Sequence, residues 1–249
     1  MDSGLYAAYT GLLSRTQALD TAANNLANAD ATGFRAQRDY FRGVLAGLDA
    51  QTNRSQIGDA VNAYGILGGT RADLSQGRIT STGNPLDLAI NGDGFFAVKT
   101  PQGTRYTRDG AFLRAEDGTL TTRKGQPVLS NTGTPIILPA GDVHLASDGT
   151  VSVSGPEGSA IVGSLGIYTA DATDLSAEGA NLMRLRDGAK LSASTAAIQQ
   201  GSLEGANQDT VHGTMQLLMI QRQAEMMQRA LSVFNNDFDK TAAEDLGKV

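Results

Sequence analysis

Residues 217–238 read LLMIQRQAEMMQRALSVFNNDF, and the apolar residues in this stretch recur alternately three and four positions apart. This spacing is typical of a helix that packs along a coiled-coil seam. The seam residues are Leu217, Ile220, Ala224, Met227, Leu231, Phe234 and Phe238. The pattern predicts a helix from Asn207 to about Asp245, and its apolar seam requires a helical partner.

A matching stripe lies near the N-terminus, where leucines recur every seven residues. They are Leu5, Leu12, Leu19 and Leu26. This spacing predicts a helix over residues 3–28, which ends before Gly33. The two seams are the simplest partners for each other, and then for copies in neighbouring subunits. The sequence therefore predicts an α+β fold in which the N- and C-terminal helices pair as a coiled coil.

The C-terminal helix carries a second apolar stripe, well over 100° around the helix from the seam. Its residues are Val211, Leu218, Met219, Met226 and Val233. A helix that is apolar on two faces is buried on two faces. Two interpretations stay open: a central helix in a globular core, or a helix that packs on its N-terminal partner and also on neighbours in an assembly.

Between the helices, from Pro85 to about Gly201, apolar residues alternate with a period of two, as in Leu86–Ile90 and Phe96–Lys99. Turn dipeptides separate these segments, at residues 91–92, 109–110, 117–118, 148–149 and 187–188. Asn-Gly and Asp-Gly favour tight hairpins. The pattern predicts a mainly antiparallel β domain, similar to a sandwich or small barrel. The predicted organisation is a helical domain over 1–33 and 205–249, an irregular extension or linker over 34–80, and a β-rich outer domain over 81–204.

Composition excludes several classes of function. The 249 residues carry a formal net charge of −6 without a marked basic run, which disfavours a nucleic-acid surface. Cysteine is absent, which excludes disulfides and thiolate chemistry. No apolar run approaches the ~18 residues of a membrane span. No signal peptide is evident, so any export is expected to proceed without a cleaved leader.

Sequence motifs that would indicate catalysis, cofactor binding or metal binding match poorly. Residues 92–97, GDGFFA, fit a dinucleotide fingerprint, but the alternating segment that follows favours a hairpin over the required helix. His144 and His212 are too isolated to indicate a metal site. Four aspartates precede or flank glycines, where local turns favour them: Asp93, Asp109, Asp117 and Asp148. We expect no enzyme activity, cofactor, metal or small-molecule substrate.

Three asparagines lie close together near the end of the N-terminal helix. Asn24, Asn25 and Asn28 are poor interior helix formers. One interpretation is fraying of the helix before Gly33, and the other is amide hydrogen bonding to adjacent chains. The position of Asn24 and Asn28, away from the leucines, favours the second.

Several longer motifs point to one protein family. Residues 24–35 read NNLANADATGFR, 82–90 read TGNPLDLAI, 92–96 read GDGFF, 106–110 read YTRDG and 201–207 read GSLEGAN. Together they resemble the bacterial flagellar rod and hook proteins, with the poorest match over about 36–70. The motif positions are Ala27, Thr32, Gly33, Phe34, Asn84, Pro85, Leu86, Asp87, Gly92, Gly94, Phe95, Phe96, Tyr106, Thr107, Arg108 and Gly110. Hook subunits are usually longer, with an extra outer domain for which this chain has no room. The start of the chain and the short stretch between Phe34 and the β region favour the proximal rod type, and a distal rod or hook-type axial protein of the same family is the alternative.

The resemblance implies a function. In this family the terminal helices form an inner coiled-coil domain, the β insertion faces outward, and subunits stack into a helical shaft that transmits torque from motor to hook. The implied partners are copies of the chain, other rod proteins and the flagellar type III export apparatus. A different class of function stays open, in which the helices dimerise a β module that binds a ligand or the cell wall. An enzyme with a site on the β domain is a weaker third alternative.

Overall fold

The chain folds into two compact units. The computed structural model describes residues 2–42, 66–156, 158–179 and 181–246. The helical unit comprises Met1–Leu26, Arg38–Thr70 and Thr210–Val249, and the β unit comprises Ala27–Gln37 and Arg71–Asp209. Each unit is built from segments far apart in the sequence, and the helical unit draws on both ends of the chain.

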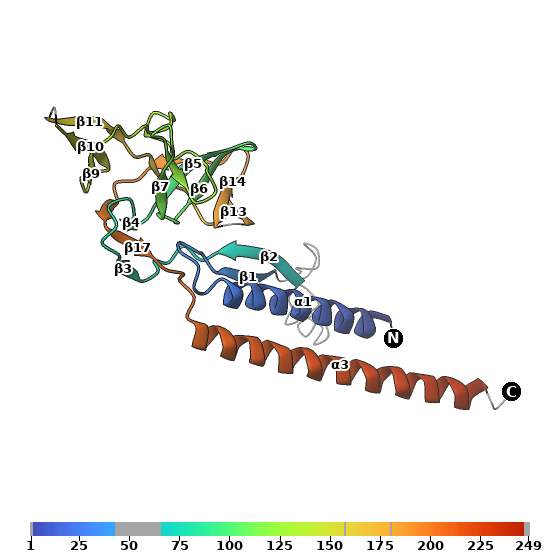
Figure 1. Cartoon of the computed structure of the whole chain (residues 1–249). Helices are drawn as coiled ribbons and strands as arrows, with labels where there is room; N and C mark the ends of the chain where they lie inside the picture. The colour runs from blue at the N-terminus through green and yellow to red at the C-terminus, as the bar shows by residue number, and fades with distance from the viewer. Residues whose placement is uncertain (1, 43–65, 157, 180, 247–249) are drawn as a thin grey trace. The chain divides into compact units, whose positions relative to one another are not determined.

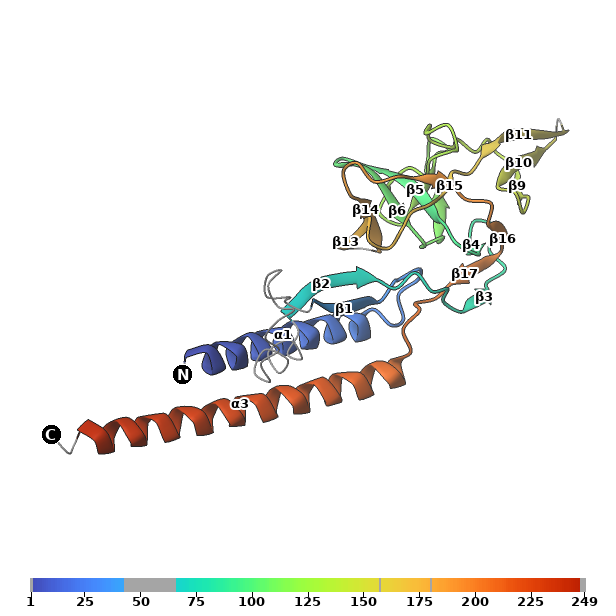
Figure 2. The ribbon, with the colours of Figure 1, turned by 180° about the vertical axis from the view of Figure 1, so that it is seen from behind.

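The helical unit contains two long antiparallel helices and a small sheet (Figures 1 and 2). Helix α1 spans Asp2–Ala27 and helix α3 spans Thr210–Leu246, as the apolar spacing predicted within a few residues. Strands β1 (Gln37–Arg42) and β2 (Ile66–Ala72) form the sheet. Thr21 Oγ1 in α1 donates a hydrogen bond of 3.0 Å to Asp39 Oδ1 in β1. On α3, Met227 Cε lies 3.4 Å from the place that a Cβ on Gly11 would take, so α1 contacts both elements.

The region between residues 34 and 80 differs from its prediction as an irregular extension. It contains β1 and β2, and Arg71–Ser81 already belongs to the β unit. Tyr40 of β1 lies 3.3 Å from the place of a Cβ on Gly69 of β2, and Gly69 has a φ of 130°. Glycine at position 69 leaves room for the side chain of Tyr40. From the sequence alone, this segment was predicted to be irregular. Most of the predicted extension, residues 43–65, lies outside the described residues.

The β unit is a set of separate antiparallel sheets. The largest has the strand order β13-β14-β6-β5-β12-β15, a second has the order β11-β10-β9, and three pairs are β16-β4, β17-β3 and β7-β8. The strands are β3 (Ile79–Ser81), β4 (Leu88–Asn91), β5 (Phe95–Thr100), β6 (Gly103–Thr107), β7 (Phe112–Arg114), β8 (Leu120–Thr122), β9 (Asp142–Leu145), β10 (Thr150–Gly155), β11 (Gly158–Ser164), β12 (Ile167–Thr169), β13 (Leu175–Gly179), β14 (Leu182–Leu185), β15 (Ser192–Ala193), β16 (Ala197–Gln200) and β17 (Ser202–Glu204). Within the described residues the sheets do not close into the barrel that the strand spacing suggested, because the strands are short and glycine turns redirect the chain between them.

Strand β5 lies at the centre of the β unit and is buried on both faces. Phe96 and Val98 face one apolar cluster, and Phe95 and Ala97 face another. The ring of Phe96 meets the ring of Phe112 edge to face, with centroids 5.1 Å apart. This alternation explains why the run from Phe95 to Val98 is almost continuously apolar, as in other strands that are covered on both sides.

The turn dipeptides fall into two groups. Residues 117–118 connect the paired strands β7 and β8, and residues 148–149 connect β9 and β10, so both hairpins were predicted correctly. The hairpin expected at residues 91–92 is wrong, because β4 pairs with β16 while β5 pairs with β6. Residues 109–110 likewise connect strands of different sheets. Local turn chemistry favours a change of direction but does not choose the strand that the chain pairs with next.

Candidate functional site

The motif residues around Gly33 lead from the end of α1 into the β unit. Gly33 has a φ of 65°, and its N–H donates a hydrogen bond of 2.7 Å to the carbonyl of Glu204. A Cβ on Gly33 would lie 2.2 Å from the backbone nitrogen of Asp109. Only glycine fits both this backbone conformation and this close approach. The sequence thus brings residues 33–36 against the segment that precedes α3.

Glu204, the last residue of β17, is fully buried, and its carboxylate accepts three hydrogen bonds. Its Oε1 accepts from Arg35 Nη2 at 2.7 Å and from the backbone N–H of Gly77 at 2.7 Å. Its Oε2 accepts from Arg108 Nη1 at 2.9 Å. The side chains of Arg35 and Arg108 are almost as inaccessible as that of Glu204. We call Arg35, Arg108 and Glu204 the buried charge triad.

Arg108 links the triad to the glycine-rich segment that follows β4. Its Nη1 donates to the Ile90 carbonyl at 3.2 Å, and its Nη2 donates to the Gly92 carbonyl at 2.6 Å. The guanidinium carbon lies 5.4 Å from the centre of the Phe95 ring, within range of a cation–π interaction. Burial lowers the pKa of Arg108, and the neighbouring carboxylate of Glu204 opposes that shift. The GDGFF motif is therefore shaped as a receptor for an arginine, not as a phosphate cradle.

The triad carries two positive charges for one negative charge. Among the residues that the structure describes, Arg35 Nε, Arg35 Nη1 and Arg108 Nε have no hydrogen-bond partner. Buried ion pairs seldom stabilise a protein more than a well-packed apolar cluster would, but removing one partner is strongly destabilising. The triad joins three segments that are distant in the sequence, and we expect loss of the Glu204 charge to be the most costly, because it leaves both arginines without a counter-charge.

Two asparagine side chains form hydrogen bonds with the segments next to the buried charge triad. The Asn207 side chain accepts from the Ala36 N–H at 2.8 Å and donates to the carbonyls of Asp73, at 2.8 Å, and Ser75, at 3.1 Å. The Asn181 Nδ2 donates to the Thr32 carbonyl at 2.8 Å. The segments that follow α1 and precede α3 are thus held side by side within the β unit.

The other acidic side chains in these motifs and turns make local hydrogen bonds that close the turns. Asp87 accepts from Thr82 Oγ1 at 2.7 Å and from Asn84 Nδ2 at 3.0 Å, which closes the TGNPLD turn. Asp109 Oδ1 accepts from the Ala111 N–H at 3.1 Å, and burial raises the pKa of Asp109. Asp117 and Asp148 make the same kind of contact to the residue two positions on. These contacts confirm the prediction of turn residues for Asp109, Asp117 and Asp148, and for Asp93 it stays a prediction.

The two apolar faces of α3 differ in exposure. On the seam, Leu231 is 6% exposed. The other described seam residues are half-buried: Leu217, Ile220, Ala224 and Met227. The opposite face carries six large apolar side chains that are 50–65% exposed, which we call the outer stripe: Val211, Met215, Leu218, Met219, Met226 and Val233. The sequence pattern had not singled out Met215. The side chains of Phe234 and Phe238, and of Leu5 on α1, lie outside the described residues.

On α1 the most buried residues are not the leucines. Leu12, Leu19 and Leu26 are half-buried, whereas the fully buried positions are Ser14, Ala18, Ala22 and Asn25. A face of small residues lets neighbouring elements approach the helix closely, as Met227 does at Gly11. Interlocking of the leucines with the α3 seam therefore stays a prediction. Of the other asparagines, Asn24 is exposed and Asn28 is half-buried.

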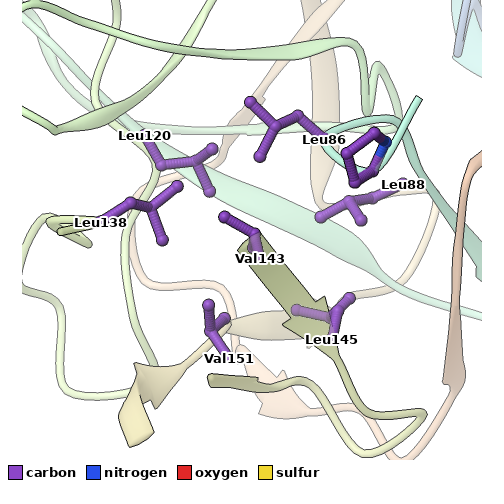
Figure 3. A pocket seen from close by; sticks show the side chains of 8 residues that line it. Leu86, Leu88, Leu120, Leu138, Val143, Leu145 and Val151 are labelled. Atoms are coloured by element: carbon purple, nitrogen blue, oxygen red, sulfur yellow. The ribbon is translucent and has the colours of Figure 1, made fainter. Parts of the chain in front are cut away.

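Two small cavities lie in the described part of the β unit. Seven aliphatic side chains surround an apolar recess of about 10 Å³ under β9, together with Pro85 (Figure 3). A second cavity, of about 210 Å³, is bordered by Asp93, Arg108 and Asp171, and lies below the usual range for ligand sites, ~300–1,000 Å³. The described residues contain no cluster of acidic or histidine side chains suited to a metal ion. No described helix has both the length and the apolar character needed to cross a membrane.

Comparison with known proteins identifies the family. The chain is 34% identical to the flagellar basal-body rod protein FlgF of Caulobacter vibrioides, over the full length of both chains. The chain belongs to the flagellar basal-body rod protein family. It is also 34% identical to FlgF of Mesorhizobium japonicum, with 90% of each chain covered, and 35% identical to FlgG of Bacillus subtilis, with 88% and 89% covered. FlgF is a proximal rod protein, which agrees with the proximal rod type that the sequence motifs favoured.

Two family models map onto the elements described above. The model for flagella basal body rod proteins matches residues 5–35, from α1 to Arg35 of the triad. The model for the flagellar hook protein FlgE/F/G D1 domain matches residues 89–153, which include Arg108. Members of the rod protein family are structural proteins of the flagellar basal body and not enzymes.

All three triad residues lie within the family motifs, but their pairing is not evident from the sequence. Glu204 lies 169 residues from Arg35 and 96 from Arg108. The sequence carried no signal for this pairing, because the alternation Ser202-Leu203-Glu204 favours an inward Leu203, whereas the structure buries Ser202 and Glu204.

Proposed function

We propose that this chain is a structural subunit of a flagellar basal-body rod. It assembles through its terminal helices, with copies of itself and with other rod proteins, into a helical shaft that transmits torque from motor to hook. The outer stripe of α3 carries this proposal, together with similarity to rod proteins along the whole chain. We also propose delivery by the flagellar export apparatus, as the family resemblance implies.

The exposure of the outer stripe requires a partner. Fully burying one large apolar side chain contributes ~1.5–3 kcal/mol. Covering six side chains that are half to two-thirds exposed would therefore contribute roughly 5–10 kcal/mol before ordering costs. Exposed apolar patches of this kind mark interaction surfaces in soluble proteins. A contact between different faces of two copies that does not close into a ring builds a filament.

Substitution on the outer stripe tests the proposal. Leu218→Asp places a charge at the centre of the stripe, and Gln221→Asp is the matched control, because Gln221 is exposed on α3 but lies off the stripe. In cells that lack the native gene, we expect Leu218→Asp to abolish swimming and to leave basal bodies without complete rods in electron micrographs. The control should restore both.

The circular dichroism of the purified Leu218→Asp chain should match that of the native chain, which separates loss of assembly from loss of folding. Complete rods and normal swimming with Leu218→Asp would refute the proposal. Purified native chain that forms only discrete dimers would instead favour the β module that binds a ligand or the cell wall.

A further inference from the structure

The face of α3 that bears the outer stripe also bears two positive charges, and the exposed Glu225 lies at its edge, about 20° around the helix from Leu218, so the face is net positive. At 100° per residue, Arg222 and Arg229 fall on the same face as Leu218, Met226 and Val233. Both arginines are exposed, and they lie seven residues apart, which is about two helical turns or ~10 Å along the axis. A partner for this face must therefore offer apolar contact together with negative charge.

Helix α1 has an outward face with that composition. Tyr9 and Leu13 are at least half exposed, and Asp20 and Ala27 continue the same exposed face at spacings of seven residues. This face lies opposite the small buried residues centred on Ala18. Asp20 gives this face a negative charge. Arg15 lies about 140° around the helix from Asp20 and therefore falls on a different face.

The charged groups on both faces are available for a partner. The side chains of Asp20, Arg222 and Arg229 make no hydrogen bond or ion pair with any residue in the described part of the chain. The faces are also complementary in kind, since each is an apolar stripe interrupted by charge. Pairing the α3 stripe with its own copy would bring arginines together, which like-charge repulsion disfavours.

We propose that the outward face of α1 in one copy docks on the outer stripe of α3 in a neighbouring copy, with Asp20 beside Arg222 or Arg229. This inference rests on the proposed function and names the two faces that meet. The contact joins different faces and leaves a free α1 face and a free α3 stripe at the two ends of the pair, so it can repeat along a filament. The two arginines define two registers that differ by one heptad.

Charge reversal tests the pairing in the full-length chain. Asp20→Arg alone, and Arg222→Asp with Arg229→Asp, each replace attraction by repulsion. Each should reduce the number of complete rods by about tenfold, the change that 1.4 kcal/mol gives in an equilibrium constant. The triple variant restores opposite charges and should recover rods to within about twofold of native, a difference of ~0.4 kcal/mol.

The absence of native cysteine permits an independent measurement. Asp20→Cys combined with Arg222→Cys or with Arg229→Cys should yield disulfide-linked chain dimers in isolated basal bodies, and the pair that reacts identifies the register. Asp20→Cys with Gln221→Cys is the control and should give no more dimer than Asp20→Cys alone.

Two results would overturn the pairing: a triple variant that assembles no better than the single reversals, or a control pair that cross-links as strongly as the arginine pairs. Failure of the proposed function would be distinguishable, because it appears as complete rods with Leu218→Asp. Loss of rods with Leu218→Asp without recovery in the triple variant would leave the rod function intact and refute this pairing alone.

Discussion

Replacing Glu204 by glutamine is the sharpest test of the buried charge triad. Glutamine keeps the size and shape of the side chain but removes the negative charge between Arg35 and Arg108. The amide oxygen still accepts hydrogen bonds at one position. The amide nitrogen, however, is a donor and would face either an arginine N–H or the Gly77 N–H.

The expected loss of stability follows from these contacts. Glu204 accepts two charge-assisted hydrogen bonds and one from the backbone, at 2.7–2.9 Å. The substitution leaves two buried guanidinium groups without a counter-charge. Breaking a buried ion pair by removing one partner costs ~3–5 kcal/mol. For a chain of this size, each kcal/mol lowers the melting temperature by ~2–4 °C, so Glu204→Gln should melt roughly 6–20 °C below the native chain.

Urea unfolding of the purified full-length chain, followed by circular dichroism in the β region, measures this loss. Glu178→Gln is the matched control, because Glu178 pairs with Arg105 but its side chain is 40% exposed. Exposed ion pairs contribute ~0–1 kcal/mol, so the control should stay close to native. If Glu204→Gln unfolds within about 1 kcal/mol of the control, the triad does not hold these segments together and the reasoning is wrong.

Three further predictions concern other parts of the molecule. Leu231→Asp puts a charge into the buried seam of α3 and should abolish rod assembly, seen by electron microscopy, while near-native β-sheet circular dichroism persists. Gly110→Ala would place a Cβ 1.7 Å from the Leu88 carbonyl oxygen and should cost about 2 kcal/mol or more in urea unfolding, whereas Gly163→Ala, in open space, should change stability by less than ~0.5 kcal/mol. Burial raises the pKa of Asp109 above its ordinary value of 3.8, so the native chain loses stability as pH rises through the raised pKa. Asp109→Asn should therefore be more stable than native at neutral pH, and this difference should vanish in unfolding measured below pH 3.8; an equal difference at both pH values would contradict the assignment.

Hydrophobic periodicity was sufficient to predict the secondary structure of much of the chain. The three-and-four spacing located α3, and alternation located β10, because each signal depends only on which face of a local element is covered. Strands β4 and β5 were also located, although consecutive residues of both are buried. Hydrophobic periodicity was less informative about which residues of a helix pack against neighbouring elements. The leucines of α1 predicted the helix correctly, but the fully buried face belongs to the small residues around Ala18, whose burial depends on how closely neighbouring elements approach.

Long-range pairing was the part that the sequence did not reveal. The Asn-Gly turn at residues 91–92 reads as a hairpin, yet the Ile90 and Gly92 carbonyls are directed at Arg108 instead of toward a neighbouring hairpin strand. A buried arginine in one motif and a buried glutamate in another become a pair only when the topology is known. No periodic pattern within a single motif records an interaction across 96 or 169 residues.

The fastening of residues 32–36 beside residues 202–207 has a mechanical consequence. A pull on the segments leading to α1 or α3 is met first by the hydrogen bonds from Gly33 to Glu204 and from Ala36 to Asn207. Because these bonds join the two ends of the β unit to each other, its strands are protected from being peeled away one at a time from either terminus. If the chain serves in the proposed shaft, repeated twisting would therefore strain a short, dense cluster of polar contacts before it reached the sheets.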